Sequence, residues 1–142
     1  MAAFVIDASA TLPWCFADEA TDATNALLTR LQAGDEALVP AHWPAEVANA
    51  LLVAVRRRRI SPQDARQFLE NLDVLPIRIE TMTQKLVRLH ILPLAEAHNL
   101  TIYDASYLEL AMRQTASLAT LDDHLRKAAR ASGVPLLAEP QP

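Results

Sequence analysis

The sequence predicts an α/β fold with a central parallel sheet of about five short strands, and three observations support this prediction. Short apolar runs recur along the chain, each bounded by turn or helix signals, as in strands that are covered on both faces. Segments with the spacing of amphipathic helices lie between these runs. Some intervals hold two such segments, which is typical of crossovers between parallel strands.

The predicted strands are apolar nearly throughout, and each is only a few residues long. They cover residues 3–6, 37–39, 75–79, 117–120 and 135–137. In an open parallel sheet, ligands bind beyond the carboxyl ends of the strands. The residues that follow these runs are therefore the first candidates for a functional site.

Helical patterns fill the remaining chain, and several carry start or stop signals. Ser61 and Pro62 are typical of a helix start, with the serine as cap and proline in the first position. Pro93 should break or kink its segment, and Gly133 sits where a helix C-terminus favours glycine. After the first strand, Ser9 is a candidate helix cap. The helical segments are 22–33, 44–58, 61–72, 81–98, 104–114 and 122–132.

Composition limits the class of protein. The 142 residues suit one domain, assigned to residues 1–138 with a loose tail at 139–142. A net charge of −4 argues against coating nucleic acid by bulk charge, and two glycines are too few for phosphate-binding loops. The single cysteine, Cys15, and the lack of a membrane span or signal peptide lead us to expect a cytoplasmic protein without membrane contact.

Four acids lie near predicted strand ends or helix starts, at the same expected edge of the sheet: Asp7, Glu46, Asp104 and Asp122. Any one of them could simply be a helix cap. Together, four neighbouring carboxylates repel one another unless cations are bound, and hard oxygen ligands suit Mg²⁺ or Mn²⁺. One or two such ions can activate water and stabilise the charge on a phosphodiester.

Polar residues beside the acids are candidates for supporting roles. Asn49 lies one helical turn from Glu46 and could hydrogen-bond its carboxylate. Ser9 and Thr120 carry hydroxyls that could orient a metal ligand or a water, although each could equally be an ordinary cap or turn residue. The pattern of residue types does not decide between Asp122 and its neighbour Asp123.

The acids lie in segments that resemble those of PIN-domain ribonucleases, and among these the VapC-type toxins of bacterial type II toxin–antitoxin pairs. The segments are FVIDASA at 4–10, VPAHWPAEVANALL at 39–52, LTIYDASYLELA at 100–111 and LATLDDHLRKAARASGVPLL at 118–137. They follow the family's order with similar spacing and span nearly the whole chain. The resemblance implies a PIN-like three-layer α/β/α sandwich.

The resemblance also implies a function and a set of site residues. It implies a Mg²⁺-dependent endoribonuclease, with Mn²⁺ able to substitute, that cuts single-stranded or looped RNA such as a tRNA or rRNA. Asp7 and Asp104 resemble the main metal ligands, while Glu46 and Asp122 complete the quartet as second-site or water-mediated ligands. The family's Thr-x-Asp pattern favours Asp122 over Asp123. Ser9 and Thr120 resemble its polar helpers, and the expected partners are an antitoxin protein and a second copy of the chain.

Other residues allow two interpretations. The run Arg56-Arg57-Arg58-Arg59 is either a solvated helix end or a contact for RNA phosphates. Trp14 and Phe16 are either core residues or part of a protein interface. Helical spacing assigns Leu108, Ala111 and Met112 to the core. The four histidines show no zinc-site spacing and are expected to be surface or packing residues.

Two other enzyme or signalling classes fit the sequence less well. A receiver domain expects paired acids after its first strand and a lysine at a later strand end, whereas Lys85 and Lys127 lie in helical segments. A haloacid dehalogenase phosphatase expects an acid at the position of Ser9. The alternative that remains open is a catalytically silent RNA-binding or partner-binding module on the same fold.

Overall fold

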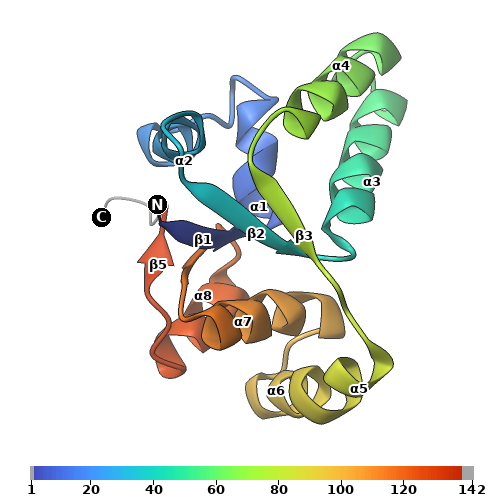
Figure 1. Cartoon of the computed structure of the whole chain (residues 1–142). Helices are drawn as coiled ribbons and strands as arrows, with labels where there is room; N and C mark the ends of the chain where they lie inside the picture. The colour runs from blue at the N-terminus through green and yellow to red at the C-terminus, as the bar shows by residue number, and fades with distance from the viewer. Residues whose placement is uncertain (1, 139–142) are drawn as a thin grey trace.

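Five parallel strands form the centre of the molecule, as shown by a computed structural model that describes residues 2–138 (Figure 1). Their order across the sheet is β3-β2-β1-β4-β5, so the N-terminal strand lies in the middle. The strands are β1 (Ala3–Ile6), β2 (Glu36–Pro40), β3 (Ile77–Glu80), β4 (Ser117–Ala119) and β5 (Leu136–Leu137). The predicted α/β fold with about five short parallel strands is therefore confirmed.

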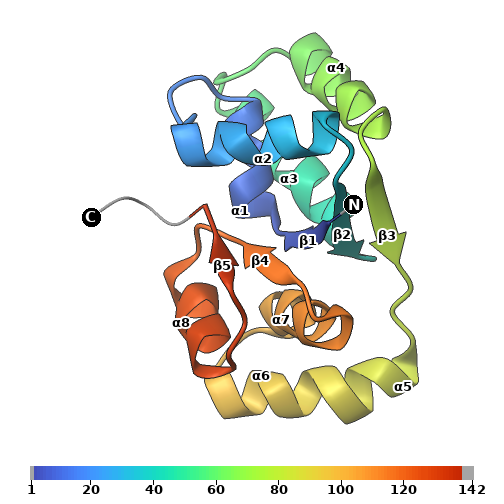
Figure 2. The ribbon, with the colours of Figure 1, turned by 60° about the vertical axis from the view of Figure 1, so that its left-hand side comes forward.

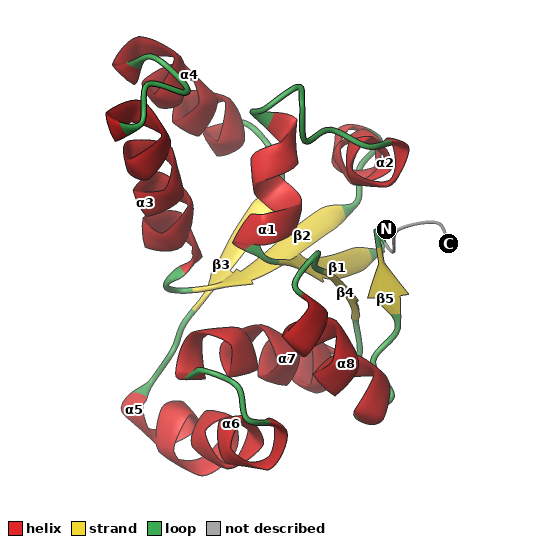
Figure 3. Cartoon of the chain, turned by 180° about the vertical axis from the view of Figure 1, so that it is seen from behind, coloured by secondary structure: helices red, strands yellow, loops and turns green. Residues whose placement is uncertain are grey.

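Helices cover both faces of this sheet, which makes the predicted three-layer sandwich (Figures 1 and 3). One layer consists of α1 (Ala8–Thr11), the 3₁₀ turn η1 (Leu12–Trp14), α2 (Asp22–Gln32), α3 (Trp43–Arg56) and α4 (Pro62–Asp73). The other contains α7 (Ile102–Gln114) and α8 (Asp123–Ala131), with α5 (Gln84–Leu86), the π-helical segment η2 (Val87–Ile91) and α6 (Leu92–His98) outside α7. No helix within residues 2–138 is long and apolar enough to cross a membrane.

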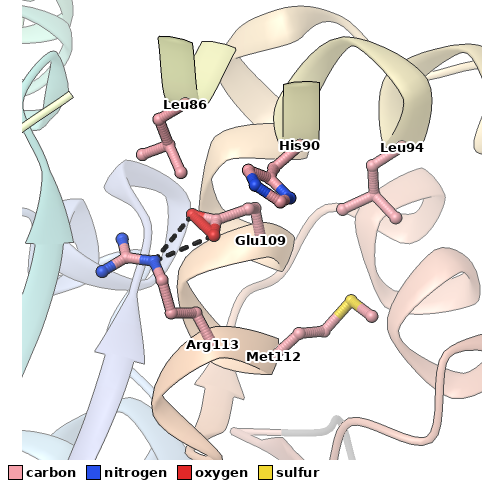
Figure 4. Close-up of a pocket in the computed structure, with 6 residues that line it drawn as sticks. All are labelled: Leu86, His90, Leu94, Glu109, Met112 and Arg113. Atoms are coloured by element: carbon pink, nitrogen blue, oxygen red, sulfur yellow. Dashed lines mark hydrogen bonds and ion pairs between the residues drawn. The ribbon is translucent and has the colours of Figure 1, made fainter. Parts of the chain in front are cut away.

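The core lies on both sides of β1, because this central strand is covered by helices above and below. Phe4, Val5 and Ile6 are fully buried. The predicted core positions Leu108 and Ala111 are also buried, but Met112 is 45% exposed, so its assignment to the core is wrong. Met112 lies on the side of α7 that faces away from the sheet, where α6 covers the helix only in part (Figure 4).

Several predicted helix signals have the expected geometry. The Ser61 hydroxyl accepts a hydrogen bond from the backbone N–H of Asp64 at 3.0 Å, and Gly133 follows α8 with φ of +73°. The segment predicted to break or kink at Pro93 does not break but continues as one helical rod (Figure 2), with an irregular π-helical stretch just before the proline. Proline lacks the N–H of a regular helical turn, and a π-bulge accommodates that loss.

The first helix differs from the prediction in its cap. Asp7, not Ser9, caps α1, because its Oδ1 accepts the backbone N–H of Ala10 at 3.0 Å. Phe16 is buried, and the half-buried Trp14 donates from Nε1 to the carbonyl of Thr24 at 2.8 Å. Both aromatic rings are therefore packing residues rather than parts of an exposed interface.

Candidate active site

The carboxyl edge of the sheet gathers acids from four separate parts of the chain. β1 ends beside β4, and the backbone N–H of Asp7 donates to the carbonyl of Ala119 at 3.1 Å. β2 lies on the other side of β1 and leads into α3, which carries Glu46 in its first turn. Asp104 lies in the first turn of α7, a helix that begins at this edge because it runs back to the start of β4.

Asp7 is the most buried of these acids, with 4% of its surface exposed. Its Oδ1 accepts hydrogen bonds from the Ser9 hydroxyl at 2.6 Å and from the Ala10 N–H at 3.0 Å, while Oδ2 accepts one from the Thr120 hydroxyl. Burial raises its pKa from 3.8 to about 6, although these donors act in the opposite direction. The charge of Glu46 adds to the rise.

Ser9 and Thr120 join the ends of β1 and β4 as well as holding Asp7. The Ser9 hydroxyl accepts the backbone N–H of Leu121 at 2.8 Å, and the Thr120 hydroxyl accepts that of Asp122 at 3.1 Å. Both hydroxyls thus donate to the Asp7 carboxylate and accept from the chain that leads to Asp122. The Asp7 side chain is consequently fixed in one orientation, with both oxygens engaged.

Glu46, on α3, accepts a hydrogen bond from a buried tyrosine on α7. The Tyr107 hydroxyl donates to Glu46 Oε1 at 2.5 Å, and Tyr107 is fully buried. Burial and this hydrogen bond both raise the Tyr107 pKa, so the hydroxyl keeps its proton for the carboxylate. Asn49, the predicted partner of Glu46, is exposed on α3, and no hydrogen bond joins the two within residues 2–138.

Asp104 and Asp122 lie close enough for their charges to interact. Burial raises the pKa of Asp104, and the charges of Asp122 and Glu46 add to this effect. Asp122 Oδ1 caps α8 by accepting the backbone N–H of Leu125 at 2.8 Å. Asp122 is half-buried, whereas its neighbour Asp123 is exposed.

None of the four acids makes an ion pair with an arginine or lysine among the described residues, although other carboxylates of the chain do. Arg30 pairs with Asp35, and Arg113 pairs with Glu109. Two histidines lie near the acids: Nε2 of His42 is 4.0 Å from Glu46 Oε1, with the His42 pKa lowered by burial, and the charge of His124 acts to lower the pKa of Asp104. The cluster therefore carries negative charge that no arginine or lysine within residues 2–138 balances by an ion pair.

This donor set fits a hard divalent cation. In residues 2–138 no group of three or more acidic, histidine or cysteine side chains lies close enough together to hold a metal ion by itself. Mg²⁺ suits such a site, since it usually binds to one or two carboxylates and retains waters or takes substrate phosphates as its other ligands. Ca²⁺ and Zn²⁺ favour more complete protein ligand shells.

The predicted RNA-contacting arginines lie away from these acids. Helix α3 starts near Glu46 and ends at Arg56, about 15 Å further along its axis at 1.5 Å per residue. Arg59 pairs with Asp18 and Glu19. The structure thus places the run Arg56-Arg57-Arg58-Arg59 at the far end of α3, exposed to solvent.

Sequence reasoning did not single out Tyr107, His42 and Tyr103, which all lie beside the acids. Tyr107 is one helical turn after Asp104, and this spacing was a usable signal. The same spacing equally fits a core aromatic, so only the fold distinguishes the two roles.

Comparison with known proteins agrees with the fold. The family model of the PIN domain matches residues 4–131. No curated protein matches the chain. Among solved structures, PAE2754 from Pyrobaculum aerophilum is 20% identical with a TM-score of 0.73, covering 95% of this chain and 83% of that one.

Two further solved structures share the fold at low identity. VapBC2 from Rickettsia felis, bound to a DNA fragment from its promoter, is 14% identical with a TM-score of 0.62, over 94% of this chain and 96% of that one. VapC20 from Mycobacterium tuberculosis, described as a sarcin-ricin loop cleaving toxin, is 18% identical with a TM-score of 0.63, over 88% of this chain and 94% of that one.

Proposed function

This chain belongs to the PIN domain family, and we propose that it is a Mg²⁺-dependent endoribonuclease that hydrolyses RNA phosphodiester bonds. The observation that carries the proposal is the open cluster of Asp7, Glu46, Asp104 and Asp122 without an arginine or lysine partner in the described chain. A cluster of acids without opposite charges destabilises the fold. A bound cation would neutralise that charge and would explain why the protein keeps the acids together.

The resemblance to the family's motifs assigns two kinds of role to the four acids. Asp7 and Asp104 would hold the cation, with Glu46 and Asp122 as second-site or water-mediated ligands. When bound, Mg²⁺ or Mn²⁺ lowers the pKa of a coordinated water and neutralises charge on the phosphodiester. Neutralisation also lets a polyanion approach a protein of net charge −4.

The side chains around the acids serve to orient them. Ser9 and Thr120 fix the Asp7 carboxylate from two sides, so that its position changes little when substrate arrives. Tyr107 fixes Glu46, whose side chain is 39% exposed and therefore accessible to an attacking water. Glu46 is placed to accept a hydrogen bond from that water and orient it toward phosphorus.

For the biological role, we propose the toxin of a bacterial toxin–antitoxin pair that acts on a tRNA or rRNA in the cytoplasm. Support comes from the shared fold with VapC20, described as a sarcin-ricin loop cleaving toxin, and with VapBC2. A cognate antitoxin and a second copy of the chain are the proposed protein partners. Induced expression that arrests bacterial growth in wild type and not in Asp7→Asn would support this role.

The nuclease proposal is tested by incubating purified, partner-free protein with total bacterial RNA in Mg²⁺, Mn²⁺ or EDTA. We expect discrete cleavage with either metal, none in EDTA, and none from Asp7→Asn or Asp104→Asn. If the folded wild-type protein leaves RNA intact with both metals, the chain is a silent RNA-binding or partner-binding module instead.

A further inference from the structure

The aromatic side chains of this protein are distributed unevenly between core and surface. The chain has seven phenylalanine, tyrosine and tryptophan residues, all within the described part. Six are buried or half-buried, whereas Tyr103 is 61% exposed. Within residues 2–138, Tyr103 is therefore the aromatic ring that is most accessible to a ligand in solution.

Tyr103 lies directly beside the acid cluster. It precedes Asp104 at the start of α7, and its ring centroid lies 5.3 Å from that of His42 at an interplanar angle of 59°. The His42 ring in turn meets the buried Tyr107 ring edge-on, with centroids 5.1 Å apart. Three rings thus form a continuous series from the surface to the tyrosine that holds Glu46.

His42 acts as a backing ring in this series. Its two ring nitrogens are buried and have no hydrogen-bond partner among residues 2–138. The ring packs against both neighbouring tyrosine rings, in tilted and edge-on arrangements that aromatic pairs favour. Tyr103 consequently packs on a supported ring on one side, while most of its surface faces solvent.

We propose that Tyr103 is a binding subsite for one unpaired RNA base, which stacks on its exposed ring beside the phosphodiester to be cut. This inference rests on the proposed function and names how the site recognises single-stranded RNA. Bases of single-stranded RNA commonly stack on exposed aromatic side chains, and such stacking does not depend on charge. A protein of net charge −4 whose site is acidic needs an uncharged contact of this kind.

The test uses full-length protein and short single-stranded RNAs that carry one 2-aminopurine, moved base by base along the strand. An Asp7→Asn background keeps the RNA intact during binding and removes one acidic charge from the site. Stacking quenches 2-aminopurine, so we expect quenching at one position relative to the cleavage point. Tyr103→Leu should abolish that quenching and raise the Kd about tenfold, whereas Tyr103→Phe, which keeps the ring, should restore both.

Matched measurements separate base stacking on Tyr103 from a general effect of replacing an exposed side chain with leucine. Met112→Leu changes an exposed apolar side chain elsewhere on α7 and should bind RNA as the parent protein does. In the otherwise wild-type enzyme, Tyr103→Leu should raise KM more than it lowers kcat.

Three results would overturn the inference. The first is a Tyr103→Leu variant whose 2-aminopurine quenching and RNA Kd equal those of the parent protein. The second is the absence of quenching at every position of the RNA. The third is a Tyr103→Leu variant that binds RNA normally and fails only to assemble with a protein. Failure of the proposed function looks different, because wild-type protein would then cut no RNA while the fluorescence of bound RNA still reports on Tyr103.

Discussion

Helix α7 carries a buried acid, Glu109, in its C-terminal half and a half-buried acid, Asp104, in its first turn, and the surroundings of the two acids differ. In its C-terminal half, Glu109 lines a pocket of about 410 Å³ between α7 and the α5–α6 rod. Arg113 Nε donates to both Glu109 oxygens, at 3.2 and 2.9 Å (Figure 4). At the other end, Asp104 joins a cluster in which no arginine or lysine pairs with the acids within residues 2–138.

The difference separates an acid that the fold itself balances from the acids to which we assign a reaction in the proposed function. Glu109 is 8% exposed and Asp7 is 4% exposed, so both are removed from water. A cation one helical turn away balances Glu109, whereas Asp7 has only neutral donors and a pKa raised to about 6 by burial. A fold keeps such an unfavourable charge where binding or chemistry requires it.

The largest expected effect comes from removing one charge at the acidic end. Asp104→Asn should lower RNA cleavage about 10³-fold or more, because the cation loses a ligand and the phosphodiester loses its charge stabilisation. Initial rates of cleavage of a defined RNA in Mg²⁺ measure this. Glu109→Gln is the matched control on the same helix, and similar losses in both variants would contradict the distinction between the two ends.

A second prediction concerns stability without metal. Because the folded pKa of Asp7 lies above its ordinary value of 3.8, wild-type protein loses stability as the pH rises from about 4 to about 6. Asp7→Asn avoids this ionisation and should be more stable than wild type at pH 7 by up to about 3 kcal/mol. Denaturant unfolding in EDTA at pH 7 and below pH 4 measures the difference, which should nearly vanish at the lower pH.

Tyr107→Phe should have an intermediate effect, since it removes one hydroxyl and keeps the ring. Glu46 then loses its 2.5 Å hydrogen bond, and cleavage should fall about 10- to 100-fold. Loss of the buried hydrogen bond should lower the free energy of unfolding by about 1 kcal/mol. Full activity in a folded Tyr107→Phe protein would show that Glu46 needs no such support.

The smallest effect is expected at the pocket end of α7. Glu109→Gln weakens its pairing with the partly exposed Arg113 and should cost about 1 kcal/mol of stability. RNA cleavage should remain at the wild-type rate, because this pair lies outside the acid cluster. A stable Glu109→Gln variant with impaired cleavage would show that the pocket has a functional role and not only a structural one.

The sequence was sufficient to predict those parts of the structure that depend on local patterns. The apolar runs predicted all five strands, and β1 has the bounds expected for it. Parallel order then brings the strand ends to one edge, which is why Asp7 and Asp122 could be linked although they are far apart in the chain.

Features that depend on side-chain packing could not be read from those patterns. Asp7 caps α1 in place of Ser9, because its carboxylate at the end of β1 accepts the backbone N–H of Ala10 in the first turn of the helix. Met112 has core spacing but lies where the neighbouring helix leaves α7 open. Tyr107 and Asn49 both lie within one turn of an acid, and only tertiary structure selects the tyrosine as the partner of Glu46.

Thermal unfolding of metal-free protein with and without added Mn²⁺ at pH 7 tests the central claim most directly. If the acid cluster is a cation site, Mn²⁺ should raise the Tm of wild type and of Glu109→Gln equally, and should not raise that of Asp7→Asn or Asp104→Asn. If Mn²⁺ leaves the wild-type Tm unchanged, or raises all four proteins alike, the acids are helix caps and not a metal site.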